Sequence, residues 1–93
     1  MAKITVRFKG PIGGHVTGGA VEVELQNEST ISELLSRLMQ QVPYLQTIWN
    51  SASEIDRDSM ILCNEVDIGV SGGLSSIVND GDVLTILPLV HGG

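Results

Sequence analysis

Apolar and polar residues alternate strictly in two segments near the start of the chain. Residues 3–8 place isoleucine, valine and phenylalanine at every second position, and residues 21–25 place valine, valine and leucine there. A period of two is typical of a strand with one buried face. The two segments therefore predict an antiparallel hairpin, joined by the long glycine-rich stretch 10–19.

A helix with one apolar face is predicted to begin after Thr30. Thr30 and Glu33 fit a capping box, in which each side chain accepts a hydrogen bond from the other residue's backbone amide. Apolar side chains then recur at helical spacing, at Ile31, Leu34, Leu35, Leu38, Met39 and Val42. Pro43 disfavours the helical conformation of the residue before it, so the helix should end there.

The segment after this helix is less regular. Leu45, Ile48 and Trp49 have a brief helical spacing that residues 50–53 interrupt, so we expect a short helical turn and then a loop up to Arg57. We expect Trp49 to be a core or edge anchor rather than a ligand platform, because no basic residues accompany the indole.

A short apolar strand is predicted at residues 60–63. A turn at 64–65, a small return strand at 66–68 and a loop at 69–73 should follow it. We expect Cys63 to pack within its strand, because no His or Lys lies near it in the sequence to lower the pKa of its thiol.

The last part of the chain combines a tight turn with an apolar strand. Residues 79–82 read Asn-Asp-Gly-Asp, in which the glycine tolerates positive φ and the Asx side chains can bond nearby amides. Residues 83–87 are apolar apart from Thr85, which predicts a largely buried strand. Pro88 removes a ladder donor, so we expect pairing to stop there and residues 88–93 to form a flexible tail.

The order strand, strand, helix, strand, short strand, final strand is that of the β-grasp. We therefore predict one α+β domain over residues 1–93, with a mixed sheet of four to five strands wrapped on one main helix. The first and last strands should be central, parallel neighbours, because the elements between them supply the long crossover that such a pair needs. The predicted core comprises Ile4, Val6, Phe8, Val21, Val23, Leu25, Ile31, Leu34, Leu35, Leu38, Leu62, Leu84 and Ile86.

Composition narrows the function classes. The net charge is −6, from 11 acids against five bases, and no run of Lys or Arg could follow phosphates, which argues against a nucleic-acid partner. No apolar run approaches the ~20 residues that span a bilayer, so we expect no membrane partner. A single cysteine and the absence of a signal-peptide pattern lead us to expect a cytoplasmic protein.

No catalytic centre is visible in the sequence. The two histidines, His15 and His91, lie in glycine-rich surroundings, and no His or Cys pair has the spacing of metal ligands. The 10–19 stretch lacks the Lys-Ser/Thr ending of a phosphate loop. We therefore expect no metal and no bound cofactor, and a carrier or substrate rather than an enzyme.

The chain closes with Gly92-Gly93. A carboxylate behind two residues without side chains is an unhindered acyl group that can lie in a narrow channel. Because its pKa is near ~3.5, it is ionised at neutral pH and resists nucleophiles until another protein activates it.

This closing pattern resembles the MoaD/ThiS family of small sulfur carriers, which are relatives of ubiquitin. The resemblance is carried by the Asp-Gly-Asp turn at 80–82, by Pro88 and by Gly92-Gly93. The stretch 71–74, Ser-Gly-Gly-Leu, is similar to that of members that feed sulfur to cysteine synthesis. One departure is His91, where many members carry alanine or another small residue.

The resemblance implies a chemistry for Gly93. An ATP-dependent adenylyltransferase related to ubiquitin-activating enzymes would join AMP to it, and a sulfur donor would then leave a thiocarboxylate. The residues implied to lie in the partner's active site are Pro88, Leu89, Val90, His91 and Gly92. The sulfur would pass to the large subunit of molybdopterin synthase, whose small subunit this chain would be, or to a cysteine synthase. The length of 93 residues and the insertion 44–57 argue against the shorter thiamin-type carriers.

Strand parity predicts a docking surface beside the tail. If Leu84 and Ile86 face the helix, the alternate residues of the final strand face outward, where a leucine is costly to leave in water. The expected docking residues are Ile61, Thr85 and Leu87, with Leu89 beside them. The acidic residues expected to steer a basic partner toward them are Asp80, Asp82 and Glu65.

Two alternatives remain open. The chain could be a ubiquitin-like modifier joined to lysines through Gly93, which Gly-Gly remnants on other proteins would reveal. It could also be a non-covalent β-grasp binding module, in which case its function should survive removal of Gly92 and Gly93.

Overall fold

The computed structural model describes residues 1–10 and 19–89. Its strands are β1 (Ala2–Phe8), β2 (Ala20–Leu25), β3 (Ser29–Thr30), β4 (Ser59–Cys63), β5 (Val66–Asp67), β6 (Ile77–Val78) and β7 (Val83–Pro88). Its helices are α1 (Ile31–Gln41), α2 (Ala52–Asp58) and the short α3 (Ile68–Ser71), with 3₁₀ turns η3 (Pro43–Thr47) and η4 (Gly73–Ser75).

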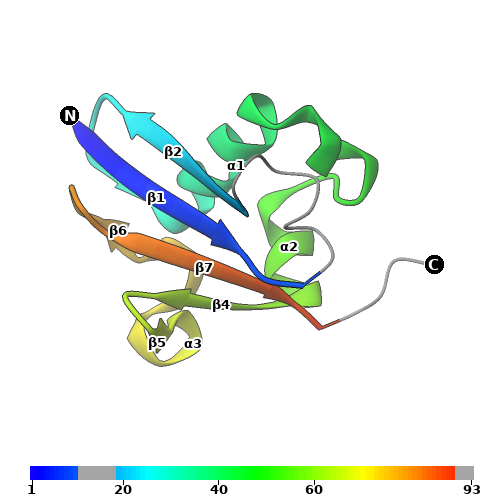
Figure 1. Ribbon diagram of the computed structural model, residues 1–93. Helices are drawn as coiled ribbons and strands as arrows, with labels where there is room; N and C mark the ends of the chain where they lie inside the picture. Colours follow the sequence, from blue (N-terminus) through cyan, green and yellow to red (C-terminus); the bar gives the residue numbers. More distant parts are fainter. Residues whose placement is uncertain (11–18, 90–93) are drawn as a thin grey trace.

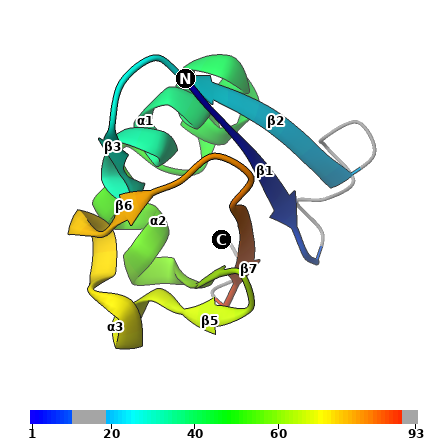
Figure 2. The ribbon, with the colours of Figure 1, turned by 90° about the vertical axis from the view of Figure 1, so that its left-hand side faces the viewer.

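The main sheet has five strands in the order β2-β1-β7-β4-β5. β1 pairs with β2 antiparallel and with β7 parallel, and β7 pairs with β4 antiparallel. Figures 1 and 2 show α1 and α2 on the same side of this sheet. The predicted α+β fold, the β-grasp order and the central parallel pair are therefore confirmed. A second sheet of β3 and β6 was not predicted, because strands of two residues show no periodicity.

The local signals for α1 act as expected. The Thr30 hydroxyl accepts from the Glu33 amide at 3.2 Å, and the Glu33 carboxylate accepts from the Thr30 amide at 2.8 Å. The helix ends at Gln41, and the amide of Val42 still donates to the Leu38 carbonyl at 2.8 Å. The buried face of α1 consists of Ile31, Leu34, Leu35, Leu38 and Met39.

The predicted core is confirmed at eleven of thirteen positions, counted from the residues that are buried. Val21 packs against the core but is only half-buried. The prediction that Leu62 is a core residue is wrong, because Leu62 pairs with Thr85 on the outer face. The residue before it, Ile61, pairs with Ile86 and is 2% exposed. Opposite residues on paired strands point to the same side of a sheet, so Ile86 fixes the inward position of Ile61.

Two of the predicted loops are helical. Residues 52–58 form α2, because Ser51 caps the helix by accepting from the Glu54 amide at 3.4 Å, and Ala52 and Ile55 are buried. The Ser-x-x-Glu spacing of a capping box was the signal that the sequence analysis missed. The predicted loop 69–73 likewise contains α3, which begins at Ile68 and so shortens the predicted return strand.

Candidate functional site

The end of β7 is the part of the structure that carries the C-terminal tail. Pro88 is the last residue of the strand and pairs with Ser59 of β4. The Leu89 amide then donates to the Asp58 carbonyl at 2.8 Å, so pairing continues one bond beyond the predicted stop at Pro88. The Leu89 residue itself is 60% exposed. The strand thus delivers the chain to the surface, held by a final backbone hydrogen bond.

The residue predicted to react, Gly93, and most of the predicted tail lie outside the described residues. These are Val90, His91, Gly92 and Gly93. Their placement in a partner's active site, and their flexibility, stay predictions. The tail begins later than predicted, however, because Pro88 belongs to β7.

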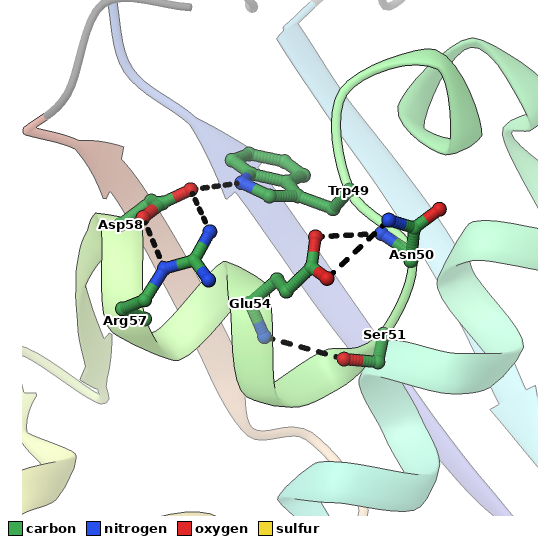
Figure 3. A network of polar contacts seen from close by, with 6 residues as sticks. All are labelled: Trp49, Asn50, Ser51, Glu54, Arg57 and Asp58. Atoms are coloured by element: carbon green, nitrogen blue, oxygen red, sulfur yellow. Dashed lines mark hydrogen bonds and ion pairs between the residues drawn. The ribbon is translucent and has the colours of Figure 1, made fainter.

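Asp58, whose carbonyl holds Leu89, is itself fixed by two side chains (Figure 3). The Trp49 indole nitrogen donates to its carboxylate at 3.1 Å, and Arg57 donates at 2.8 and 3.1 Å. The Arg57 hydrogen bonds, helped by that of Trp49, hold the pKa of the Asp58 carboxyl below its usual range. Trp49 is 2% exposed, which confirms its prediction as a core anchor. The insertion 44–57 therefore ends in a polar cluster that supports the base of the tail.

The capped start of α2 belongs to the same network. The Asn50 amide donates to the Glu54 carboxylate at 3.0 Å, while the Glu54 amide donates to Ser51 (Figure 3). These bonds fix the helix whose last residue is Asp58. The role of Asp58 does not follow from the sequence pattern, which predicted a loop up to Arg57 rather than the helix that ends at Asp58.

The outer face of the sheet beside the tail is apolar. Leu87 pairs with Met60, and Thr85 pairs with Leu62. Met60 is 38% exposed, and the other three are half-buried. The predicted outward positions of Thr85 and Leu87 are confirmed, and their docking role stays a prediction. Ile61 is wrong as a docking residue, because it faces the core, and Met60 takes its place on this surface.

The predicted steering acids lie at the opposite end of β7. Figure 1 shows the turn before β7 beside the N-terminus, whereas the strand's other end lies beside α2. Asp82 accepts from the Asn79 amide at 2.8 Å and from the Asn64 side chain at 2.9 Å. Asp80 accepts from the Lys3 amide at 2.8 Å. These two carboxylates form the turn, as predicted, but they do not adjoin Leu87. Glu65 follows Asn64 in the turn next to Asp82, so it is also remote from the tail.

Cys63 is a packed strand residue rather than an activated nucleophile. Its thiol lies 3.8 Å from an Asp82 carboxylate oxygen. Burial raises the pKa of the Cys63 thiol, and the nearby carboxylate raises it further. A thiol with a raised pKa is mostly protonated at neutral pH and reacts slowly.

The part of the chain that the structure describes contains no group of three His, Cys, Asp or Glu residues that could hold a metal ion. His15 and His91 lie outside that part. No helix within residues 1–10 and 19–89 is long and apolar enough to cross a membrane.

The glycines of the stretch 71–74 have a structural role. Gly72 has φ of +120°, which L side chains rarely adopt, and a Cβ there would lie 2.6 Å from the Ser76 hydroxyl. The same hydroxyl donates to the Ser71 carbonyl at 3.0 Å. This stretch therefore shapes the connection between α3 and β6.

Comparison with known proteins matches residues 15–93 to the ThiS family. The sulfur carrier protein CysO of Mycobacterium tuberculosis (strain ATCC 25618 / H37Rv) is 41% identical over 78 residues, which cover 83% of this chain and 72% of the relative. A ubiquitin-related modifier 1 homolog of Caenorhabditis elegans is 26% identical over 95 residues, covering 97% and 95% of the two chains.

A solved structure extends the likeness to the fold. The crystal structure of the Amycolatopsis orientalis BexX/CysO complex contains a chain that is 32% identical, with a TM-score of 0.69. The match covers 97% of this chain and 99% of that chain.

Proposed function

The chain belongs to the ThiS family of small sulfur carriers, and we propose that it carries sulfur as a thiocarboxylate on Gly93. It is a carrier rather than an enzyme, so the chemical groups that activate Gly93 belong to a partner. The observation that carries the proposal is the exit of the central strand. β7 ends at the surface next to an apolar patch, and the sequence beyond it closes in Gly-Gly.

The activating partner is an adenylyltransferase related to ubiquitin-activating enzymes. A carboxylate oxygen of Gly93 attacks the α-phosphorus of ATP, and pyrophosphate leaves. The resulting acyl-adenylate is a mixed anhydride, so hydrosulfide can attack its carbonyl carbon. AMP then leaves with the electron pair of the broken C–O bond, and a thiocarboxylate and a proton remain. ATP is bound and consumed by the partner, not by this chain.

The docking surface for that partner is the apolar outer patch, formed by Met60, Leu62, Thr85 and Leu87. Leu89 lies where the tail departs and is exposed. A partner that covers these side chains would remove apolar surface from water while it receives the tail. The sulfur-accepting enzyme, molybdopterin synthase large subunit or a cysteine synthase, would use the same patch after the activating enzyme has left.

The test is the intact mass of the chain after incubation with ATP, an activating enzyme and sulfide. Replacement of one oxygen by sulfur adds about 16 Da, and we expect this gain on the wild-type chain. A chain lengthened by one alanine after Gly93 is the control, because it keeps the docking surface and moves the carboxylate. The extended chain should compete for the enzyme and gain no mass. The same gain on both chains, or none on the wild type, would exclude the proposed mechanism.

A second candidate is a ubiquitin-like modifier conjugated to lysines through Gly93. It is supported by the 26% identity with the ubiquitin-related modifier 1 homolog over nearly the whole of both chains. Mass spectrometry of lysate from cells that express the chain would detect Gly-Gly remnants on lysines of other proteins. Their presence, and their loss when Gly93 is deleted, would support conjugation.

A further inference from the structure

Two cations lie beside the base of the tail on the outer face of the sheet. Arg7 of β1 pairs with Thr85 of β7. The Lys9 amide donates to the Ile86 carbonyl at 3.0 Å, which continues the parallel pairing and puts Lys9 next to the last residues of the strand. Both residues are exposed, and Phe8 between them is buried, so their side chains are directed away from the core.

These cations have no acidic partner within residues 1–10 and 19–89. The ion pair found in that part of the chain joins Arg57 to Asp58. Lys3, on the same face of β1, lies opposite Glu24 of β2, whereas Arg7 lies opposite Ala20. Arg7 and Lys9 thus form no ion pair in the described residues, although Glu22 of β2, opposite Thr5, lies diagonal to Arg7 on the same face.

The outer face is polarised across the strands as well. One row of paired residues runs Ala20, Arg7, Thr85, Leu62, Asp67 across all five strands. The cation and the acid in this row are three strand spacings apart, or about 14 Å at ~4.8 Å per spacing. The apolar patch lies between them. A partner on this face therefore meets positive charge on the β1 side of the apolar patch.

The sign of this charge is unusual for the chain. The net charge is −6, with only five Lys and Arg residues, and three of these five are Lys3, Arg7 and Lys9. The net negative charge makes the electrostatic potential around most of the molecule negative, which attracts basic surfaces. Next to Arg7 and Lys9 the local potential would instead be positive and attract acidic groups. Rim charges beside an apolar patch mainly set the association rate and the partner that is accepted.

We propose, on the premise of the proposed function, that Arg7 and Lys9 are the charged rim of the docking surface. The activating enzyme places acidic residues against them when it receives the tail. This replaces the expectation of a basic partner steered by Asp80, Asp82 and Glu65, because those residues lie at the other end of β7. The apolar patch supplies burial, and the two cations fix which way round the enzyme docks.

The test compares two double charge reversals with the same net charge. One variant carries Arg7→Glu and Lys9→Glu, and the control carries Lys3→Glu and Arg37→Glu, which are exposed and away from the tail. Pyrophosphate release by the activating enzyme with ATP gives KM and kcat for each chain. We expect KM of the first variant to rise at least about tenfold with kcat nearly unchanged, and KM of the control to change by less than about threefold. The wild-type KM should rise with salt, and that of the first variant should respond less.

Several results would overturn the inference. An unchanged KM for the first variant, or equal changes in both variants, would show that the position of the cations is irrelevant. Arg7→Gln with Lys9→Gln is a milder variant that preserves the fold, and it should raise KM by an intermediate amount. Thermal unfolding of every chain shows whether it is folded. If the wild-type chain releases no pyrophosphate, the proposed function fails; if it does and the variants match it, only this inference fails.

Discussion

At the scale of single residues, the turn between β4 and β5 contains local strain. Asn64 and Glu65 both have positive φ, at 51° and 70°. Asparagine tolerates this conformation, but glutamate has a Cβ that crowds the following carbonyl at a cost of about 1–2 kcal/mol. Two-residue hairpin turns of this kind favour Asn-Gly for that reason.

Glu65→Gly should therefore stabilise the protein, although glycine loses more backbone entropy on folding. We expect a gain of about 0.5–1 kcal/mol in the free energy of unfolding, measured by thermal or denaturant unfolding. Gly81→Ala is the matched comparison, because Gly81 has φ of +90° and the alanine should destabilise. A lower free energy of unfolding for Glu65→Gly than for the wild type would contradict the inference that the backbone of Glu65 is strained.

The helix face makes a second prediction at the residue scale. Leu35 is 0% exposed and lies on the buried face of α1. Truncation to alanine should leave a cavity and cost about 2–5 kcal/mol, a large part of the stability of so small a domain. Leu62→Ala, on the half-buried outer face, should cost much less. Similar losses for the two variants in denaturant unfolding would mean that the assignment of the two faces is wrong.

At the scale of elements, a strand or helix and its buried face could be predicted where apolar residues recur at every second position or at helical spacing. β1 and α1 follow from such patterns and from the Thr30 and Glu33 capping box. The strand at 60–63 was also predicted and is β4, but its inward face was not, because residues 60–63 are all apolar and only the pairing of Ile61 with Ile86 decides which side faces the core. The error in the docking surface has the same origin, since a shift of one residue exchanges the two faces.

The support of the tail by α2 depends on one carboxylate. Arg57 and Trp49 lower the pKa of Asp58 in the folded state. The ionised carboxylate therefore adds to the free energy of unfolding at pH values above the ordinary pKa of an aspartate. This contribution is lost as the pH falls through the folded-state pKa. Asp58→Asn should therefore lower the unfolding temperature at neutral pH, and the difference from wild type should vanish in acid.

Trp49→Phe tests the same cluster at constant charge. Phenylalanine keeps most of the buried ring surface and removes the indole donor to Asp58. We expect the Leu89 amide to exchange with solvent several-fold faster, measured by NMR hydrogen exchange, because the carbonyl it binds becomes less well fixed. Exchange at the Lys9 amide, which binds β7 and not α2, is the internal control. Unchanged exchange at Leu89 would show that the hydrogen bond from Trp49 to Asp58 does not stabilise the hydrogen bond between Leu89 and Asp58.

At the scale of the whole molecule, one face of the sheet packs on the helices and the other is the face that we propose as the docking surface. The inner face packs on α1, while the outer face presents Leu87 next to the exit of the chain. Sequence could predict this division from the parity of β7 and the closing Gly-Gly, but not the opposite placement of cations and turn acids. Those positions depend on the parallel register between β1 and β7.

Leu87→Asp should prevent docking while leaving the fold intact. A charge in the middle of the apolar patch has to lose its water when a partner covers it, and we expect kcat/KM for adenylation to fall at least about 100-fold. Ile77→Asp is the matched control, because Ile77 is 44% exposed and belongs to the separate β3–β6 sheet. Pyrophosphate release near the wild-type rate from Leu87→Asp would exclude this patch as the docking surface.

The hydrogen bond between Leu89 and Asp58 also sets a length. While it is closed, residues 90–93, which follow Leu89 in the sequence, reach at most about 14 Å when fully extended. An enzyme whose reactive centre is deeper than that must open the bond, at a cost of about 0.5–1.5 kcal/mol, and gains roughly one further residue of reach. The hydrogen bond therefore relates the depth of a partner's active site to the affinity that the partner needs. A shallow site would receive the carboxylate with the bond closed, whereas a deep site would require binding energy that offsets the opening of the bond.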